Sequence, residues 1–329
     1  MYLFYYFITI PVILSTNLIL LFMNSNFFIW MIMEINMICF ISILTNTNYL
    51  KNQFLMNYFL IQSLCSYIFL WSSIFLNLKF LIDFFSMILI FSMNLKMGMP
   101  PLYHWYLKFM KKLNWMNFFL NSCIQKFIPL FVISKFIKNM NFFFIFFFYL
   151  IFISPLMSLK MKSLKLILSM SSIIQMLWII LMMNFNEKIW MLYFLFYCFI
   201  TFFLILIFKF LNLNYLFQLT FMKNSMTMIF MTNFLIFSLA SVPPFTGFLN
   251  KLMFVNITYG ALSFNLLMLM MLFSLINFYF YSRIMIFNSM FFYSLINKSF
   301  NLINYNLLNF NISLYMIISI YFIFMFEMF

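Results

Sequence analysis

Charged side chains are scarce in this sequence, and four of them accompany strongly apolar stretches. They are Glu34, Lys96, Lys126 and Lys251. An ionised side chain at the centre of a bilayer costs at least about 2.5 to 3.5 kcal/mol, and such residues usually face a bundle interior and serve ion or proton pathways. Because buried carboxyl and amine groups can gain and lose protons, these residue types predict proton transfer within a membrane.

Glu34 is the ninth of nineteen residues in the stretch NFFIWMIMEINMICFISIL. This stretch contains no other charge, so a partner must come from another helix. A lysine within about 4 Å would attract the carboxylate by on the order of 4 kcal/mol at an effective dielectric near 20. The alternative is a salt bridge that only holds helices together.

Lys96 and Lys251 each lie beside a glycine and a pair of adjacent prolines. The stretches are NLKMGMPP, with Gly98, Pro100 and Pro101, and SVPPFTGFLNK, with Pro243, Pro244 and Gly247. Proline interrupts a regular helix, and paired interrupted helices in two halves of a membrane protein point to an ion site. We therefore expect two discontinuous helices, although Lys96 alone could also extend its amine to the membrane interface.

Lys126 lies in the middle of the apolar stretch NSCIQKFIPLFV, beside Gln125 and before Pro129. It is too deep to extend to the interface, so a role in proton exchange is favoured. For Lys165, at the entrance of a later stretch, extension to the interface is favoured instead. The polar residues that follow could carry hydrogen-bonded water: Ser169, Ser171, Ser172 and Gln175.

The first proline pair is followed by an aromatic and then a basic segment. Tyr103, His104, Trp105 and Tyr106 are expected to form an interfacial aromatic belt rather than a ligand site. Lys108, Lys111 and Lys112 predict a surface helix that lies against anionic lipid or a neighbouring subunit.

Positioning these residues requires membrane-spanning helices, and we expect an all-α polytopic membrane protein whose single transmembrane domain covers residues 1–329. Apolar segments of about 20 residues recur, and continuous apolar runs exclude a membrane barrel. Eleven spanning helices are predicted at 3–22, 26–44, 55–76, 80–98, 117–137, 142–159, 164–184, 189–211, 227–247, 261–287 and 309–328.

Composition supports this class and excludes others. The chain is 67% hydrophobic and 7% charged, and its mean hydropathy is +1.10, which excludes an ordinary soluble domain. Cys39, Cys65, Cys123 and Cys198 are far apart, so neither an iron-sulfur nor a zinc site is expected, and we interpret them as buried thiols. The net charge of +14 comes from lysines scattered among loops, which argues against nucleic-acid binding.

The loop charges divide unequally when they are assigned to alternating sides of the membrane. One side holds Lys51, Lys108, Lys111, Lys112, Lys160, Lys162, Lys209, Lys223, Arg283 and Lys298, and the other Lys79, Lys135, Lys138 and Lys188. The positive-inside rule then puts the N-terminus on the positive side and the C-terminus opposite. No cleavable signal peptide is expected, because the first apolar run has no basic segment before it.

Five segments together resemble a known family. WMIMEINM, LKMGMPPLYHW, IQKFIP, SVPPFTGFLNK and NFYFYSR occur in the order and approximate spacing found in the chain 2 family of mitochondrial NADH:ubiquinone oxidoreductase, respiratory complex I. The resemblance implies an antiporter-like membrane-arm subunit of the mitochondrial inner membrane, with its positive side and N-terminus toward the matrix. Motif by motif, it implies that Glu34, Lys96, Lys126 and Lys251 form the proton-translocating chain.

The resemblance also implies partners and cofactors. Other complex I membrane-arm subunits and phospholipid, including cardiolipin, would contact this chain, and nucleic acid would not. FMN, iron-sulfur clusters and ubiquinone would belong to other subunits, with no cofactor or redox centre on this chain.

Three departures from the family pattern are visible. Many relatives have histidine where this chain has Gln175, which cannot titrate, so a relay there would need water or another group. Pro100 and Pro101 replace the usual Ala-Pro, and glycines common before the second proline pair are missing.

Three functions therefore remain open. The first is a proton-translocating subunit that couples electron transfer elsewhere to proton pumping. The second is a stand-alone cation/proton antiporter, and the third is a purely structural membrane-arm subunit. Water-filled paths to the lysines would contradict the third, and dry packing would support it.

Overall fold

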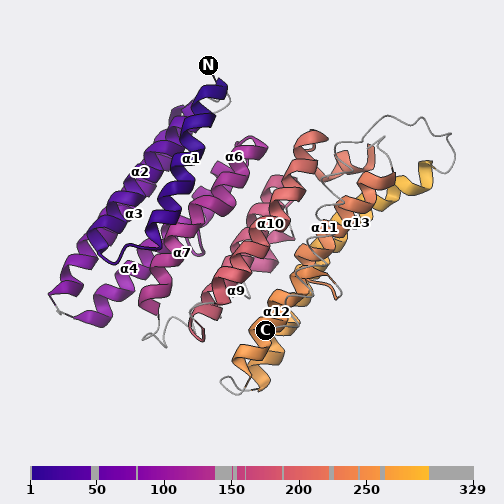
Figure 1. Ribbon diagram of the computed structural model, residues 1–329. Helices are drawn as coiled ribbons and strands as arrows, with labels where there is room; N and C mark the ends of the chain where they lie inside the picture. Colours follow the sequence, from indigo (N-terminus) through magenta and orange to yellow (C-terminus); the bar gives the residue numbers. More distant parts are fainter. Residues whose placement is uncertain are drawn as a thin grey trace. The chain divides into compact units, whose positions relative to one another are not determined.

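The computed structural model is helical and describes most of the chain (Figure 1). The described residues are 2–45, 52–78, 81–137, 150, 154–159, 161–186, 189–221, 226–243, 245–259 and 264–295. Within these ranges no strand forms, and Ser163 and Tyr215 make an isolated antiparallel bridge. The all-α prediction is confirmed for this part of the chain.

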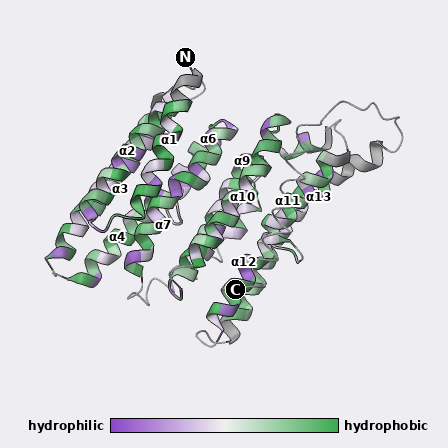
Figure 2. Cartoon of the chain, in the orientation of Figure 1, coloured by the Kyte–Doolittle hydropathy of each residue, from purple (hydrophilic) through white to green (hydrophobic). Residues whose placement is uncertain are grey.

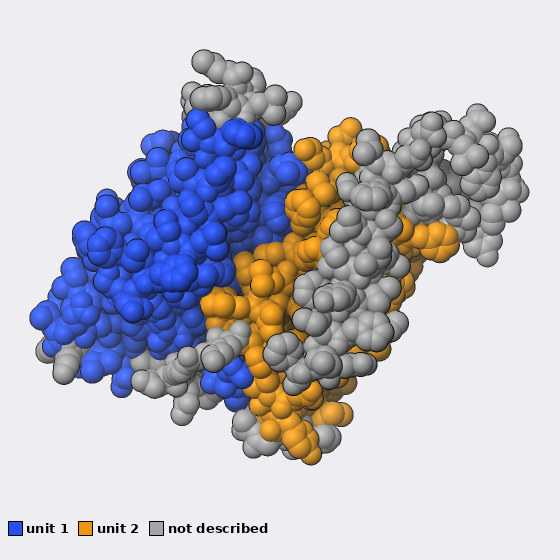
Figure 3. Space-filling view, in the orientation of Figure 1, with its two compact units in different colours: residues 1–150, 168–187 blue, residues 151–167, 188–329 orange. Residues whose placement is uncertain are grey.

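The chain divides into two compact units (Figure 3). Unit 1 comprises residues 1–150 and 168–187, and unit 2 comprises residues 151–167 and 188–329. In unit 1, α3 packs against both α2 and α4, α1 packs against α2, and α4 packs against α7. The helices within residues 1–150 are α1 (Tyr2–Leu20), α2 (Asn26–Thr45), α3 (Asn52–Asn77), α4 (Ile82–Met97), α5 (His104–Met110), α6 (Trp115–Phe119), the π-helix η1 (Leu120–Ile124) and α7 (Gln125–Phe136).

Unit 2 is built around α11, which packs against α10, α12 and α13. The Arg283 guanidinium of α13 donates hydrogen bonds to the carbonyl oxygens of Leu159 and Met161, at 2.6 and 2.7 Å, and so fixes the segment before α9 (Leu164–Met183). Most of α9 belongs to unit 1. The other elements of unit 2 are α10 (Ile189–Phe210), the 3-10 helix η3 (Leu216–Phe221), α11 (Met226–Ala240), α12 (Thr246–Thr258) and α13 (Phe264–Leu295).

Hydrophobic residues predominate along the described helices (Figure 2). Phe7 is 83% exposed and Phe22 is 81% exposed, and large apolar side chains are also exposed on α3, α10 and α13. Apolar surface this extensive is stable against lipid and not against water. By length and composition, six helices of the described part can cross a membrane, at Asn26–Thr45, Gln53–Asn77, Trp115–Phe136, Leu164–Met183, Ile189–Phe210 and Leu267–Asn288.

The helix before the first proline pair ends at a glycine cap. Gly98 has φ 70°, its N–H donates to Leu95 O at 3.0 Å, and the Met99 N–H donates to Asn94 O at 2.9 Å. This pair of bonds is the Schellman motif, which satisfies carbonyls left free at a helix end. A Cβ on Gly98 would lie 2.4 Å from the Tyr106 Cβ, so the glycine also lets α5 approach the end of α4.

The helix before the second proline pair ends in the same way but without glycine at the cap. Ser241 has φ 55°, its N–H donates to Ser238 O at 3.1 Å, and the Val242 N–H donates to Phe237 O at 3.2 Å. The glycine comes later, at Gly247 of α12, where a Cβ would overlap Ser238 O. Each glycine therefore lets the helix after the turn pack on the helix before it.

Several predicted bounds need correction. The predicted span 227–247 ends earlier, because the cap at Ser241 stops α11 at Ala240 and a separate helix, α12, follows. The predicted span 117–137 consists of α6, η1 and α7 in succession. Some predictions fall outside the described residues. They are the span at 309–328, most of the span at 142–159, and Pro244. Seven of the loop lysines that were assigned to sides of the membrane also lie outside: Lys51, Lys79, Lys138, Lys160, Lys188, Lys223 and Lys298.

Candidate functional site

Glu34 is half-buried on α2 and accepts a hydrogen bond from the Ser66 hydroxyl of α3. The expected direct pairing with Lys96 is not formed, because Lys96 Nζ is buried without a hydrogen-bond partner among the described residues. The reason is topological: α2 and α4 both pack against α3, so α3 supplies the group that meets Glu34. Both residues nevertheless contact side chains of α3 that are four positions apart, Ser66 for the Glu34 carboxylate and Gln62 for the Lys96 carbonyl.

Lys96 lies in the last turn of α4, where backbone carbonyls have no helical donor. The Gln62 side chain of α3 supplies one, because its Nε2 donates to Lys96 O at 3.1 Å. The Nζ atom is buried, so Lys96 does not extend its amine to the exterior of the unit. An amine without a direct partner depends strongly on the surrounding charges for its protonation state.

Lys126 is 2% exposed and lies against a hydroxyl and an aromatic ring. Its Nζ donates to Ser172 Oγ at 3.0 Å and lies 4.6 Å from the centroid of the Tyr106 ring. Tyr106 Oη is also 3.0 Å from Ser172 Oγ. Because the single Ser172 proton goes to Ser169 O at 2.7 Å, the Ser172 oxygen accepts from both Lys126 and Tyr106.

The backbone around Lys126 is irregular on both sides. The π-helix η1 ends at Ile124, and Pro129 lacks the N–H that would bond the Gln125 carbonyl. The Asn17 side chain of α1 donates to Ile124 O at 3.3 Å, and Gln125 Nε2 donates to Asn36 Oδ1 of α2 at 3.0 Å. Single π-helical turns occur frequently at functional sites, since they rotate the residues that follow.

Lys96 and Lys126 line the same small cavity, here called the inner cavity. Its volume of about 10 Å³ is close to the room that one water molecule needs. Its lining is Tyr58, Gln62, Lys96, Met97, Tyr106, Asn121, Gln125 and Lys126. A water there would have the several polar partners that a buried water requires.

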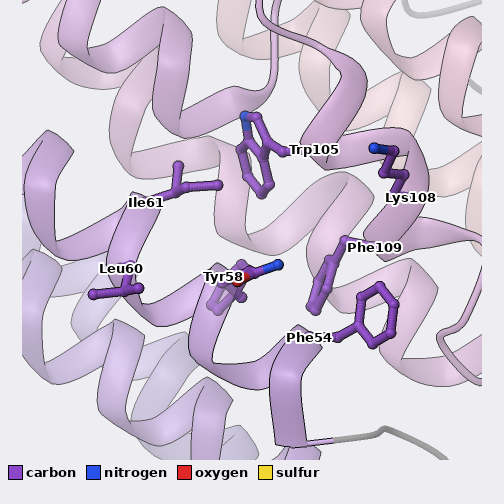
Figure 4. Close-up of a pocket in the computed structure, with 8 residues that line it drawn as sticks. Phe54, Tyr58, Leu60, Ile61, Trp105, Lys108 and Phe109 are labelled. Carbon is purple, nitrogen blue, oxygen red and sulfur yellow. The ribbon is translucent and has the colours of Figure 1, made fainter.

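Figure 4 shows the lining of a larger depression, here called the outer groove. Its volume is about 300 Å³, and α3 and α5 supply its walls. It is lined by Phe54, Asn57, Tyr58, Leu60, Ile61, Trp105, Lys108 and Phe109. Tyr58 lines both the outer groove and the inner cavity.

Lys251 lies in unit 2, on α12, and is 7% exposed. Asn250 precedes it and is also buried. On the same helix, Thr246 Oγ1 and Asn250 Oδ1 are buried and find no hydrogen-bond partner within the described part of the chain. Polar atoms in this state mark places where water or another polar group fits.

In the structure, Lys96 and Lys126 line one cavity. Glu34 contacts Ser66 of α3, a helix that also contributes to this cavity. Lys251 lies in the other unit. The belt interpretation is wrong for Tyr106, which is 1% exposed and contacts Lys126. Sequence reasoning also missed Tyr58, Gln62 and Ser66. Their spacing of four residues along one apolar helix was the available signal, since residues at this spacing share a face.

The remaining candidates differ in burial. Lys165 and Gln175 on α9 are half-buried, while Ser169, Ser171 and Ser172 are buried. Cys65 and Cys123 are buried as expected, whereas Cys39 and Cys198 are only half-buried. Lys108, Lys111 and Lys112 are exposed, as a surface segment requires.

The fold is similar to chains of three solved membrane complexes. It superposes on a chain of the Mrp complex from Dietzia sp. DQ12-45-1b with a TM-score of 0.75 at 15% identity, covering 84% of this chain and 59% of that one. For respiratory complex I from Thermus thermophilus the TM-score is 0.70 at 15% identity, with 79% and 64% covered. A chain of the archaeal membrane-bound sulfane sulfur reductase gives a TM-score of 0.72 at 15% identity, with 91% and 69% covered. This chain therefore spans about three fifths of the first two chains.

Sequence comparison gives closer relatives. No protein-family model matches the chain. NADH-ubiquinone oxidoreductase chain 2 of Locusta migratoria is 32% identical over 264 residues, which cover 78% of this chain and 77% of the relative. The same protein of Rhipicephalus sanguineus is 33% identical over 286 residues, which cover 84% and 86%. Identity of this extent over most of both chains shows that this multi-pass membrane protein belongs to the NADH-ubiquinone oxidoreductase chain 2 family.

Proposed function

We propose that this chain is a proton-translocating membrane-arm subunit of NADH:ubiquinone oxidoreductase. The observation that carries the proposal is the inner cavity, a space of about 10 Å³ that two buried lysines, Lys96 and Lys126, both line. Burying two amines in this way is costly, and function is the usual reason for ionisable groups inside a membrane. The relatives named NADH-ubiquinone oxidoreductase chain 2 supply the context of the complex.

Electron transfer in other subunits is proposed to change the charge near Glu34, and this change then passes along the chain of titratable groups. Lys96 responds because its amine is buried without a hydrogen-bond partner among the described residues, so nearby charge sets whether it holds a proton. Lys126 shares the cavity with Lys96 and feels that change directly. The protons of such groups belong to the coupled set rather than to single residues.

Lys251 is proposed as the last member of the Glu34, Lys96, Lys126 and Lys251 chain. Its burial on α12, beside polar atoms with no hydrogen-bond partner in the described part, suits a hydrated station for a proton. Water would have to carry the proton from one of these residues to the next, since each side chain is held on its own helix.

The finer architecture is part of the same proposal. Eleven helices cross the mitochondrial inner membrane, with the N-terminus on the matrix side. The segments α4–α5 and α11–α12 form two discontinuous helices, because each contains a Schellman cap followed by a second helix packed on the first. The partners are other membrane-arm subunits and phospholipid, including cardiolipin, and not nucleic acid. FMN, iron-sulfur clusters and ubiquinone reside on other subunits.

Replacement of Lys126 by methionine tests the central residue. Lys126→Met removes the amine from the inner cavity while keeping an unbranched side chain of similar length. In proteoliposomes containing the assembled complex, we expect fewer protons pumped per electron pair and normal assembly on native gels. Lys135→Met is the matched control, because Lys135 is on the same helix but exposed. Normal pumping by Lys126→Met would remove Lys126 from the mechanism.

A stand-alone cation/proton antiporter is the second candidate, and the fold similarity to the Mrp complex chain favours it. A free carrier would purify without flavin and iron-sulfur proteins. Co-purification with them supports the complex I subunit and contradicts the carrier. A purely structural subunit is the third candidate, and it would leave pumping unchanged in Lys126→Met.

A further inference from the structure

The outer groove and the inner cavity have a single lining residue in common, Tyr58 of α3. The groove opens at the surface, since it is lined by the exposed residues Leu60 and Lys108. The inner cavity holds Lys96 and Lys126. Tyr58 itself is 2% exposed, so its side chain fills the space between a surface depression and the two buried amines.

Aromatic packing holds Tyr58 in this position. Its ring stacks on the Phe109 ring of α5, with centroids 4.7 Å apart and planes 16° apart. Phe40 of α2 contacts it at 5.5 Å and Trp105 at 6.4 Å between centroids. Three rings from two other helices, α2 and α5, therefore pack against Tyr58.

Behind Tyr58, α3 continues with polar side chains on the same face. Gln62 follows at four residues and lines the inner cavity, and Ser66 follows after four more and donates to Glu34. Four residues correspond to about 6 Å along a helix, so the stripe from Tyr58 to Ser66 covers about 12 Å. The stripe leads from the partition at Tyr58 past Lys96 to Glu34.

We propose that Tyr58 is the closing residue of a water path that runs from the outer groove to the inner cavity. The groove end suits water and protons, because Asn57 and Lys108 give its rim polar groups that a purely lipid-filled cleft would lack. Tyr58 acts as a positioning residue: it touches no reacting group, and it controls whether water reaches Lys96 and Lys126. Use of this water for pumping rests on the proposed function, whereas the path itself does not.

Cys65 provides a native reporter for the path. It is buried on α3 seven residues after Tyr58, close to two full helical turns, so it lies on the same face of the helix about 10 Å further along. In the assembled complex at rest, alkylation of Cys65 by iodoacetamide is followed by mass spectrometry of its peptide. Tyr58→Ser replaces the partition with a small polar side chain, and we expect it to raise the alkylation rate by about tenfold or more, because thiol reactivity depends on access. Tyr58→Phe keeps the ring and should leave the rate unchanged.

Two variants separate an opened path from general loosening of α3. Tyr67→Ser changes the same residue type at an exposed position of α3, 58% exposed, and should not alter Cys65 alkylation. Phe85→Ser removes a buried ring of α4 that stacks on Phe75 of α3, ten residues past Cys65, and it too should leave Cys65 protected. An unchanged rate in Tyr58→Ser, or an equal rise in Phe85→Ser, would overturn the proposal.

The labelling needs no turnover, so it is independent of the pumping test. If Lys126→Met pumps normally while Tyr58→Ser opens Cys65 to alkylation, the path exists and the proton-translocating function fails. If Lys126→Met loses pumping and Cys65 stays protected, the function survives and water enters elsewhere.

Discussion

At the scale of single residues, Ser172 is the group on which the central lysine depends. Its oxygen accepts hydrogen bonds from Lys126 and Tyr106, while its proton is donated to Ser169 O. One hydroxyl therefore accepts from two buried donors. The cation over the Tyr106 ring adds a further attraction.

Replacement of Ser172 by alanine removes a single hydroxyl group, but it should lower both the stability and the pumping of the complex. Ser172→Ala leaves two buried donors without their acceptor, at a cost of about 1 to 3 kcal/mol for each group. We expect a lower midpoint of thermal inactivation of the assembled complex and weaker pumping. Ser171→Ala is the matched control, because Ser171 is equally buried but bonds only to its own helix, at Leu168 O. Equal behaviour of the two variants would contradict the role given to Ser172.

Residue types alone predicted which charges would be buried but not what they touch. Lys126 and Lys251 are buried as the apolar flanks indicate. The partner of Glu34 could not be read from the sequence, since a serine on an intervening helix carries no special signal. Tyr106 was assigned to an interfacial belt together with its aromatic neighbours, whereas in the structure it lies against Gly98 at the end of α4 and is buried.

At the scale of elements, two helix ends determine where the lysines lie. Both α4 and α11 close with a Schellman cap, but only the first has glycine in the left-handed position. A non-glycine residue with φ near 55° is strained by roughly 1 to 2 kcal/mol. The cap of α11 at Ser241 is thus the weaker of the two.

Substitutions at the two cap residues are therefore expected to change stability in opposite directions. Ser241→Gly should raise the thermal inactivation midpoint of the assembled complex by relieving the left-handed strain of about 1 kcal/mol. Gly98→Ala should lower it, since the new Cβ is strained at φ 70° and lies 2.4 Å from the Tyr106 Cβ. Gly98→Ala should also lower pumping by displacing the ring beside Lys126. A neutral Gly98→Ala would show that α5 can move away from α4 without consequence.

The sequence predicted the positions of most helices better than their ends. Continuous apolar runs put α2 and α4 within a few residues of their bounds, since length and hydropathy decide where a chain enters lipid. Hydropathy alone did not place the end of α11 at Ala240, although the prolines at 243 and 244 had indicated an interruption nearby. The π-helical turn before Lys126 was also not predicted, since the contact of Asn17 of α1 with the Ile124 carbonyl joins residues far apart in the sequence.

At the scale of the whole molecule, the proposed stations lie in two compact units. Glu34, Lys96 and Lys126 belong to unit 1 and Lys251 belongs to unit 2. If protons pass through these stations in series, each is needed for the same event. Groups that act as a unit show effects that do not add.

The double variant Lys126→Met/Lys251→Met tests this series arrangement. Because either single change already interrupts the path, the double variant should pump no fewer protons per electron pair than the more damaging single variant. The control pair Lys135→Met/Lys209→Met removes the same charge from one exposed position in each unit and should pump normally. Losses that add in the double variant would mean that Lys126 and Lys251 serve separate routes, each within its own unit. Proton counting in proteoliposomes at equal electron flux distinguishes these outcomes, since both lysines then face the same driving force.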